Sequence, residues 1–196
     1  MNKKLVLASA SPRRTALLVQ MNVAHTIVPA DIDETPKANE TPQALVKRLA
    51  AEKALAVKSL LEKQGQFTQD VVVLASDTLI AFNGESVGKP VDKADARRIL
   101  RMLSGQTHDV LTAISALDAA KRETQVVTTS VKFATLTDSQ IDAYWESGEP
   151  ADKAGSYAIQ GIGGEFVVSI NGSASAVVGL PLYETRQLLN AFGVKS

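Results

Sequence analysis

Val71-Val72-Val73-Leu74-Ala75-Ser76-Asp77-Thr78 is the stretch on which the predicted fold depends. Its uninterrupted apolar start, rich in β-branched residues, is typical of a strand that is buried on both faces. Asp77 follows the apolar run closely, and residues 79–82 continue in an extended pattern. Ligands collect beyond the carboxyl ends of strands in open α/β sheets, so Asp77 is a candidate for holding Mg²⁺ or Mn²⁺ or for taking a proton from water. Taken alone, an aspartate here is more often an ordinary turn residue.

The segments around this run predict a mixed sheet with helices packed on it. Ser11-Pro12 and Thr41-Pro42 each place a capping hydroxyl before a proline, which is typical of a helix start. Asn83-Gly84 is a strong signal for a hairpin turn. Because strands and helices do not alternate strictly, we predict the α/β fold class, with a mixed sheet and helices on both faces.

The expected elements can be given by residue number. Strands are expected at residues 5–8, 25–28, 71–75, 79–82, 110–117 and 124–134, with short ones near 166–170 and 176–178. Helices are expected at residues 12–21, 42–63, 93–102, 138–146 and 181–193. We predict a single domain over residues 1–196, with two closely joined lobes around a continuous core.

Composition and charge favour a globular protein with a small anionic ligand. The chain is 45% hydrophobic, which is ordinary for a folded protein. Lys plus Arg equals Asp plus Glu at 21 each, so the net charge is zero. A protein that wraps a nucleic acid polymer usually has a basic excess. We therefore expect no nucleic acid partner and only a local basic cluster.

No pattern in the sequence predicts a membrane protein or an oxidising compartment. No apolar run approaches the roughly 20 residues that span a bilayer. The apolar run at residues 5–8 is too short for a signal peptide, and Arg13 and Arg14 follow it closely, so a first strand is the better interpretation. Cysteine is absent, which excludes disulfides and suits a reducing compartment, and we expect the cytoplasm.

Ser9-Ala10-Ser11-Pro12-Arg13-Arg14 joins the first expected strand to the first expected helix. A helix N-terminus offers unpaired backbone N–H groups and a dipole that favour an anion. Two arginines there are unfavourable by roughly a few tenths of a kcal/mol each, unless an anion such as phosphate lies nearby. The hydroxyls of Ser9 and Ser11 can donate to such a phosphate. Alternatively, Ser11 merely caps the helix and both arginines point into water, and this segment alone does not decide.

Lys53 lies near the centre of an apolar stripe on the second expected helix. At about 100° per residue, the apolar side chains around it share one face: Leu45, Val46, Leu49, Ala50, Ala56, Val57 and Leu60. A lysine ammonium inside a core costs several kcal/mol unless a carboxylate or bound anion neutralises it. The alternative is a lysine that reaches solvent along its aliphatic stem. A functional role is favoured because such a reach is harder from the middle of a helix.

Four further residues carry weaker signals. Glu34, in an acidic loop, is a second carboxylate that can share a divalent cation with Asp77. Lys89 and Lys153 lie in turns and can contact phosphate. The Gln160 amide has both a donor and an acceptor with which to read the edge of a base. Each of these alone is also consistent with an ordinary solvated side chain.

Several common chemistries find no support. The two histidines, His25 and His108, are far apart in the sequence and cysteine is absent, so a zinc site is not expected. We interpret both as structural or surface residues. The sequence has neither a P-loop nor a G-x-S-x-G pattern, which counts against Walker-type and α/β-hydrolase chemistry.

Taken in order, these segments resemble the Maf family of nucleotide pyrophosphatases over nearly the whole chain. Any one segment is a weak signal, whereas the ordered set is highly specific. The segments that carry the resemblance are Leu7-Ala8-Ser9-Ala10-Ser11-Pro12-Arg13-Arg14, Asp33-Glu34-Thr35-Pro36, Ala51-Glu52-Lys53-Ala54, Ser76-Asp77-Thr78, Gly88-Lys89-Pro90, Leu103-Ser104-Gly105-Gln106-Thr107-His108, Asp152-Lys153-Ala154-Gly155 and Val178-Gly179-Leu180-Pro181.

The resemblance implies an elongated α/β fold with a mixed sheet and a deep cleft, related to the inosine triphosphate pyrophosphatases, and a homodimer. It also implies hydrolysis of a nucleoside triphosphate between the α and β phosphorus atoms with a divalent metal cation, Mg²⁺ or Mn²⁺. Asp77 would be the proton acceptor and would hold the metal with Glu34. The residues implied to line the triphosphate and metal site are Ser11, Arg14, Glu34, Lys53 and Lys89. The local patterns add Ser9 and Lys153 to the predicted binding set.

Arg13, Thr78 and Gln160 match the positions that separate the substrate branches of the family. These residues resemble the branch that converts dTTP or UTP, and modified pyrimidine nucleotides within that class, to the monophosphate and pyrophosphate. The 7-methyl-GTP branch tends to have a bulky aromatic, Gln and Glu at these positions. The sequence leaves three alternatives: a 7-methyl-GTP pyrophosphatase, a phosphatase that releases orthophosphate, and a non-catalytic nucleotide-sensing or septum-inhibiting module.

Overall fold

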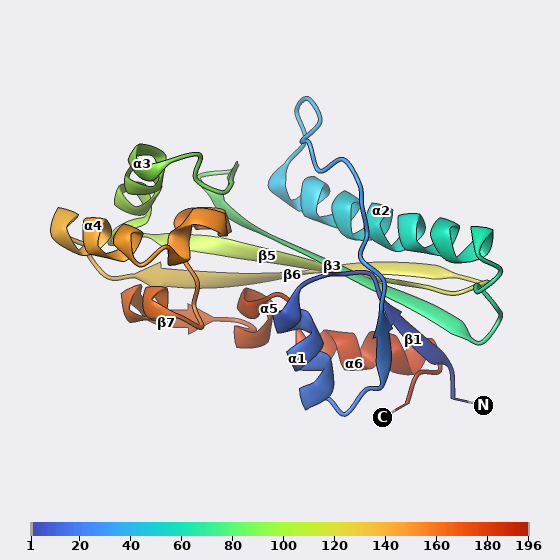
Figure 1. Cartoon of the computed structure of the whole chain (residues 1–196). Coiled ribbons are helices and arrows are strands. Elements are labelled where there is room, and N and C mark those ends of the chain that lie inside the picture. Colours follow the sequence, from blue (N-terminus) through green and yellow to red (C-terminus); the bar gives the residue numbers. More distant parts are fainter. Residues whose placement is uncertain (1, 196) are drawn as a thin grey trace.

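The computed structural model describes residues 2–195, and within them the strands form one seven-stranded mixed sheet (Figure 1). The strand order is β2-β1-β3-β5-β6-β7, and β4 pairs with β3 outside this path. The pairs of β1 with β2 and with β3 are parallel, whereas the others are antiparallel. The predicted α/β class with a mixed sheet is therefore confirmed. The strands are β1 (Lys4–Leu7), β2 (His25–Ile27), β3 (Val71–Phe82), β4 (Glu85–Val87), β5 (Thr107–Leu117), β6 (Arg122–Phe133) and β7 (Val167–Asn171).

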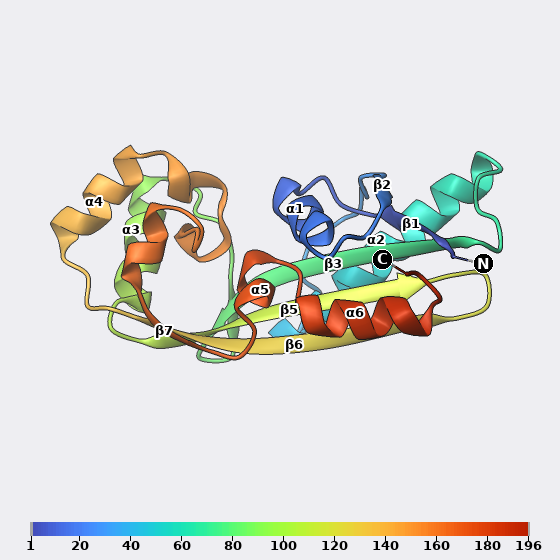
Figure 2. The ribbon, with the colours of Figure 1, turned by 90° about the horizontal axis from the view of Figure 1, so that it is seen from below.

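Helices cover both faces of the sheet. Figures 1 and 2 show α2 on one face of the sheet and α1 and α6 on the other. Helices α3 and α4 lie together near the end of the long strands that is farther from β1. The α-helices are α1 (Pro12–Gln20), α2 (Pro42–Lys63), α3 (Lys93–Leu103), α4 (Asp138–Glu146), α5 (Ala174–Val178) and α6 (Leu182–Ala191). Short 3-10 helices are η1 (Glu149–Asp152), η2 (Ala154–Ser156) and η3 (Ile162–Phe166). No helix within residues 2–195 combines the length and apolar character needed to cross a bilayer.

Strand β3 is buried on both faces by its alternating side chains. Val72 and Leu74 belong to a core cluster with residues of α1 and α6, whereas Val71 and Val73 pack with residues of α2. Successive side chains of a strand point to opposite faces, so one apolar run holds helices on both sides of the sheet. The prediction of a doubly buried strand is confirmed.

A second group of helices packs at the other end of the long strands. Ile80 and Val110, from β3 and β5, share a core cluster with residues of α3 and α4 and with the aromatic rings of Phe133, Tyr157 and Phe166. The long strands thus contribute to the apolar packing near both of their ends. This arrangement suits two lobes on a common sheet. The assignment of residues 1–196 to a single two-lobed domain stays a prediction, and residues 1 and 196 lie outside the described residues.

Asp77 does not follow the end of a strand, as the sequence pattern indicated, but lies inside β3, opposite Ala113 of β5. The predicted strands at 71–75 and 79–82 are one continuous strand because antiparallel pairing with β5 runs through the polar residues between them. The parallel partner β1, in contrast, stops at Leu7, opposite Leu74. Asp77 therefore lies just beyond the end of parallel pairing, where one neighbouring strand is missing.

Two smaller predictions were also wrong. The strand expected near 176–178 is helix α5, because the Ser173 hydroxyl caps it by accepting from Ala176 N at 3.2 Å and Gly179 ends it with a φ of +127°. Leu60, expected in the apolar stripe of α2, is 40% exposed, whereas Leu61 is 4% exposed. The stripe drifts around the helix because its turns do not repeat in whole residues.

We expect Leu74→Ala to lower the free energy of unfolding by about 2–5 kcal/mol, because Leu74 is fully buried between the sheet and α1 and α6 and its truncation leaves a cavity. Urea denaturation measures this change. Val91→Ala is the control, since Val91 is 86% exposed and should change stability by at most about 0.5 kcal/mol. Equal, small effects of both substitutions would contradict the assigned core.

Candidate active site

The N-terminus of α1 lies where β1 ends, beside β3. Ser11 caps the helix by accepting from Arg14 N at 3.5 Å, and Ser9 Oγ accepts from Ser11 N at 3.1 Å. The two arginines of this turn differ, because Arg13 is exposed whereas Arg14 is half-buried. The alternative in which both arginines point into water is therefore wrong for Arg14.

Arg14 joins α1 to two distant parts of the chain. Its Nε donates to Gly179 O at 2.9 Å, one Nη donates to Ser9 Oγ at 3.2 Å and the other donates to Thr78 Oγ1 at 3.4 Å. Ser76 Oγ also donates to Gly179 O, at 2.8 Å. Burial lowers the pKa of Arg14, and nearby Asp77 opposes that shift. The guanidinium thus holds β3, α1 and the end of α5 together.

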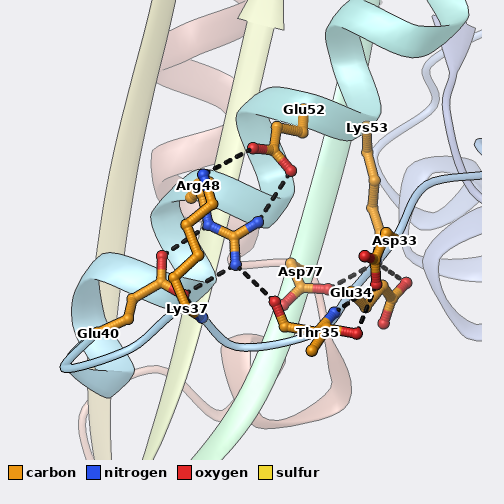
Figure 3. Close-up of polar contacts among 9 residues, drawn as sticks. All are labelled: Asp33, Glu34, Thr35, Lys37, Glu40, Arg48, Glu52, Lys53 and Asp77. Atoms are coloured by element: carbon orange, nitrogen blue, oxygen red, sulfur yellow. Dashed lines mark hydrogen bonds and ion pairs between the residues drawn. The ribbon is translucent and has the colours of Figure 1, made fainter.

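Lys53 has the carboxylate partners that a buried lysine requires. Its ammonium Nζ lies 2.7 Å from Asp77 Oδ1 and 2.7 Å from Glu34 Oε1, and its side chain is 12% exposed (Figure 3). α2 therefore delivers a cation to β3, and the loop before α2 supplies the second carboxylate. The alternative of a lysine that reaches bulk solvent does not hold, because its charge is neutralised inside the protein.

Asp77 is a carboxylate in an unfavourable environment. It is 6% exposed, and burial raises its pKa, while the charges of Lys53 and Arg14 partly offset the rise. A carboxylate with a raised pKa holds a proton more tightly and is a better general base near neutral pH than an ordinary aspartate. This is the property that proton abstraction from water requires.

A cavity of about 550 Å³ adjoins this cluster and contains most of the predicted binding residues. Its polar lining includes Ser11, Arg13, Arg14, Thr78, Lys89, Lys153 and Gln160. Ser9, Glu34, Lys53 and Asp77 lie outside that lining, and Asp77 precedes Thr78 directly in β3. The turn of Lys89 meets the segment of Lys153 through a hydrogen bond from Gly155 N to Gly88 O of 3.0 Å. Residues from distant segments thus surround one cavity.

The cavity is also lined by apolar and aromatic residues and by Asp152, whose carboxylate pairs with Lys153. Ile80, Val110, Tyr157 and Ile159 belong to the lining. Tyr157 Oη lies 2.8 Å from Nε2 of His108, which is buried, and burial lowers the pKa of that histidine to about 4. His108 is therefore neutral near pH 7 and supports the wall, as the structural interpretation predicted. A cavity lined by several cations and by apolar and aromatic groups suits a ligand with phosphates and a ring.

Glu149 was not predicted, although it holds the segment that carries Gln160. Its carboxylate accepts from Ile162 N and Gly163 N, each at 2.9 Å, and from the hydroxyl of Tyr144. Tyr144 Oη in turn accepts from Ala158 N at 3.1 Å. Nothing local in the sequence marks Glu149, because its partners lie far enough along the chain that only the folded loop brings them together.

Thr112 and Arg48 were also missed. Thr112 Oγ1 lies 3.1 Å from Thr78 Oγ1 and donates to Ala176 O at 2.7 Å, which ties the cavity wall to α5. Arg48 of α2 holds the preceding loop, in part by donating to the backbone oxygen of Thr35 at 3.1 Å. The only available signal for Arg48 was its spacing from Glu52, an i,i+4 pair that is common on solvated helices.

These features define an α/β protein in which a partly buried lysine–carboxylate cluster, with Asp77 on the sheet, lies beside a cationic cavity. The chain belongs to the Maf family, because residues 4–192 match the family model described as Maf-like protein. It is 52% identical over 196 residues to a dTTP/UTP pyrophosphatase of Shewanella sp. (strain MR-7), with 97% of this chain and 99% of that one covered.

A second sequence relative and one solved structure also resemble this chain. A dTTP/UTP pyrophosphatase of Vibrio cholerae serotype O1 is 49% identical over 189 residues, with 96% of this chain and 98% of that one covered. Among solved structures, that of the Staphylococcus aureus Ham1 protein is 18% identical, covers 67% of this chain and 72% of its own, and gives a TM-score of 0.42. The family assignment rests on the sequence relatives and the family match.

We expect Asp77→Asn to be at least as stable as the unchanged protein near neutral pH. Because the pKa of Asp77 is raised by folding, its charged form opposes folding at a pH above that raised value. The advantage of the variant should shrink as the pH falls through the raised pKa and the wild-type carboxyl becomes protonated. Urea denaturation at a series of pH values measures the difference, and a variant markedly less stable near neutral pH would contradict the assigned balance between burial and pairing.

Proposed function

We propose that this protein hydrolyses dTTP and UTP to the nucleoside monophosphate and pyrophosphate. One observation carries the proposal: the Lys53 ammonium lies 2.7 Å from both the Asp77 and the Glu34 carboxylates, beside a cavity lined by Arg14, Lys89 and Lys153. Cations that recognise phosphates therefore adjoin a potential base. The names of the relatives from Shewanella and Vibrio support the pyrimidine nucleotide as substrate.

In the proposed complex, the triphosphate contacts the cationic residues of the cavity. Arg13, Arg14, Lys89 and Lys153 supply positive charge, and the backbone N–H groups at the start of α1 supply donors. The base faces Tyr157 and Gln160, where the amide can both donate to and accept from the pyrimidine edge. Arg13, Thr78 and Gln160 are thus the proposed specificity residues, and Ser9 supports Arg14 by accepting its hydrogen bond.

The residues present fit a divalent cation such as Mg²⁺ or Mn²⁺. Within residues 2–195, no group of three or more Asp, Glu or His side chains is arranged to hold a metal by itself. Asp77 and Glu34 nevertheless converge on one point, now held by Lys53, and Mg²⁺ commonly uses one or two carboxylates together with substrate phosphates. When bound, the cation would neutralise phosphate charge and polarise the reacting phosphoryl group.

Asp77 is the proposed proton acceptor. It orients a water molecule, takes its proton as the water oxygen forms a bond to the α-phosphorus, and the bond from that phosphorus to the bridging oxygen breaks. Pyrophosphate leaves with the electrons of the broken bond. The raised pKa of Asp77 suits this step, and Lys53 keeps the carboxylate oriented from 2.7 Å and offsets negative charge nearby.

Phosphorus product analysis separates this proposal from its alternatives. The expected products are monophosphate and pyrophosphate, with turnover lost when divalent metal is omitted and regained when it is restored. Orthophosphate would indicate a phosphatase, preference for 7-methyl-GTP in a panel of triphosphates would indicate the other family branch, and tight dTTP binding without turnover would indicate a nucleotide-sensing module. We also propose that the protein forms a homodimer, which analytical sedimentation tests, and that it is located in the cytoplasm, which cell fractionation tests.

We expect Asp77→Asn to lower kcat for dTTP by at least ~100-fold, because the amide keeps the shape of the carboxylate but cannot accept the proton. Initial rates at saturating metal and nucleotide measure this loss. Asp70→Asn is the matched control, since Asp70 is half-buried just before β3 and pairs with Lys4 at 3.1 Å, away from the cavity. Near-normal turnover of the Asp77 variant would reject its assignment as the base.

We expect Gln160→Glu to lower kcat/KM for dTTP and UTP by about tenfold or more, because a carboxylate accepts hydrogen bonds but cannot donate one to a base carbonyl. Side-by-side assays with 7-methyl-GTP show whether selectivity changes as well. Gln66→Glu, at an exposed position outside the cavity, introduces the same charge and should leave kcat/KM unchanged. Equal behaviour of the two variants would remove Gln160 from base recognition.

A further inference from the structure

The loop before α2 carries Glu34 but has little apolar packing of its own. The Glu34 side chain is 58% exposed, and residues 33–39 are all exposed. If this exposed loop were held only at its ends, it would be mobile, and the Glu34 carboxylate would not stay in contact with Lys53. Its position therefore requires polar contacts on either side, and Figure 3 shows where these contacts lie.

Arg48 of α2 makes the strongest of these contacts. Its Nε donates to Glu40 Oε1 at 2.6 Å and one Nη donates to Glu40 Oε2 at 2.8 Å, while the same Nη donates to the backbone oxygen of Thr35 at 3.1 Å (Figure 3). The other Nη donates to Glu52 Oε2 at 3.0 Å. The side chains of Arg48 and Glu40 are only 16% and 9% exposed, so water weakens their pairing less than that of a surface ion pair.

The loop is also fixed internally on both sides of Glu34. Asp33 Oδ1 accepts from Thr35 N at 2.9 Å and from Thr35 Oγ1 at 2.6 Å. Glu40 Oε2, besides pairing with Arg48, accepts from Lys37 N at 3.0 Å. Glu34 lies between Asp33 and Thr35, which are bonded to each other. A displacement of Thr35 or Glu40 would therefore also displace Glu34.

We propose that Arg48 is a positioning residue for the Glu34 carboxylate. By holding the Thr35 carbonyl and the Glu40 carboxylate from α2, the helix that also carries Lys53, Arg48 sets where Glu34 meets Lys53 and Asp77. This inference rests on the proposed function, in which Glu34 and Asp77 share a divalent cation. Arg48 itself contacts neither carboxylate of that pair, so it acts through the loop.

The planar guanidinium explains why an arginine occupies this position. Four acceptor atoms, two from Glu40 and one each from Thr35 and Glu52, are engaged at once by a fork of fixed geometry. A lysine carries the same charge on a compact ammonium and cannot match two carboxylate oxygens and a carbonyl in the same way. Arg48→Lys should therefore recover only part of the effect of Arg48, although it preserves the charge.

The test measures Mn²⁺ affinity by electron paramagnetic resonance in the presence of a non-hydrolysable dTTP analogue. Arg48→Met is expected to raise the apparent Kd of Mn²⁺ by about tenfold or more, as is typical when a residue that orients a metal ligand is lost, and Arg48→Lys by less. Arg101→Met is the matched control, since Arg101 pairs with Asp138 at 2.6 and 2.7 Å on the helix pair α3 and α4 and should leave Mn²⁺ affinity unchanged.

A double-mutant cycle with Glu34→Gln separates positioning from general stabilisation. If Arg48 acts through Glu34, adding Arg48→Met to Glu34→Gln should weaken Mn²⁺ binding little further, whereas independent effects would multiply. Unchanged Mn²⁺ affinity in Arg48→Met, or full additivity with Glu34→Gln, would overturn the inference. If Arg48→Met fails to fold, Glu40→Gln replaces it in the same cycle, because it weakens the Arg48 pairing while keeping the side-chain shape.

Failure of this inference can be distinguished from failure of the proposed function. Loss of turnover in Asp77→Asn together with weakened Mn²⁺ binding in Glu34→Gln, but no effect of Arg48→Met, would reject only the role of Arg48. An active Asp77→Asn would reject the proposed base while the Mn²⁺ measurements still decide the role of Arg48. Unchanged Mn²⁺ affinity in Glu34→Gln would reject the metal role of Glu34 and, with it, the positioning role of Arg48.

Discussion

The ammonium of Lys53 is the charge around which the site is organised. A cation taken out of water at the centre of α2 must be paired, and the structure pairs it with Asp77 from β3 and Glu34 from the preceding loop. Three separate parts of the chain therefore meet at one atom. The same arrangement leaves Asp77 buried with a raised pKa, a condition that opposes folding but favours proton transfer. The cluster is therefore better explained by a role in proton transfer than by a contribution to the stability of the fold.

The sheet leaves space beside this cluster because β3 has a neighbouring strand on only one side at Asp77. β1 runs parallel to β3 only as far as Leu7, and the chain then turns into α1, whereas β5 continues beside β3 through Thr78. The polar part of β3 thus has a strand on one side and the N-terminus of α1 on the other. Arg14 bridges this gap to Thr78 and Gly179. The cavity lies where parallel pairing ends, the place at which α/β sheets commonly bind ligands.

The sequence predicted features that depend on local rules and missed those that depend on distant partners. Proline after a capping residue marked α1 and α2, and a lysine inside an apolar stripe marked Lys53 because its burial needs a counter-charge. The continuity of β3 through Asp77 depends on pairing with β5, which no local pattern reveals. Helix α5 was mistaken for a strand because its valines favour strands, whereas the Ser173 cap decided the outcome. Arg48 and Glu149 were missed because they act by holding loops whose residues lie elsewhere along the chain, and the i,i+4 spacing of Arg48 from Glu52 does not reveal this.

The loop of Glu34 and the segment of Gln160 are held in place in the same physical way. The loop of Glu34 is held by the guanidinium of Arg48, and the segment of Gln160 is held by the carboxylate of Glu149, both through hydrogen bonds to backbone groups. Directional bonds fix a loop in one geometry but release it when they break, without disturbing the apolar core of the sheet. The strands therefore carry Asp77 and Thr78, whereas Glu34, the second carboxylate proposed for the metal, and Gln160, proposed to read the nucleobase, lie on segments held by these hydrogen bonds. The positions of Glu34 and Gln160 therefore depend on a few directional polar contacts, whereas the position of Asp77 depends on the pairing of β3 with β5.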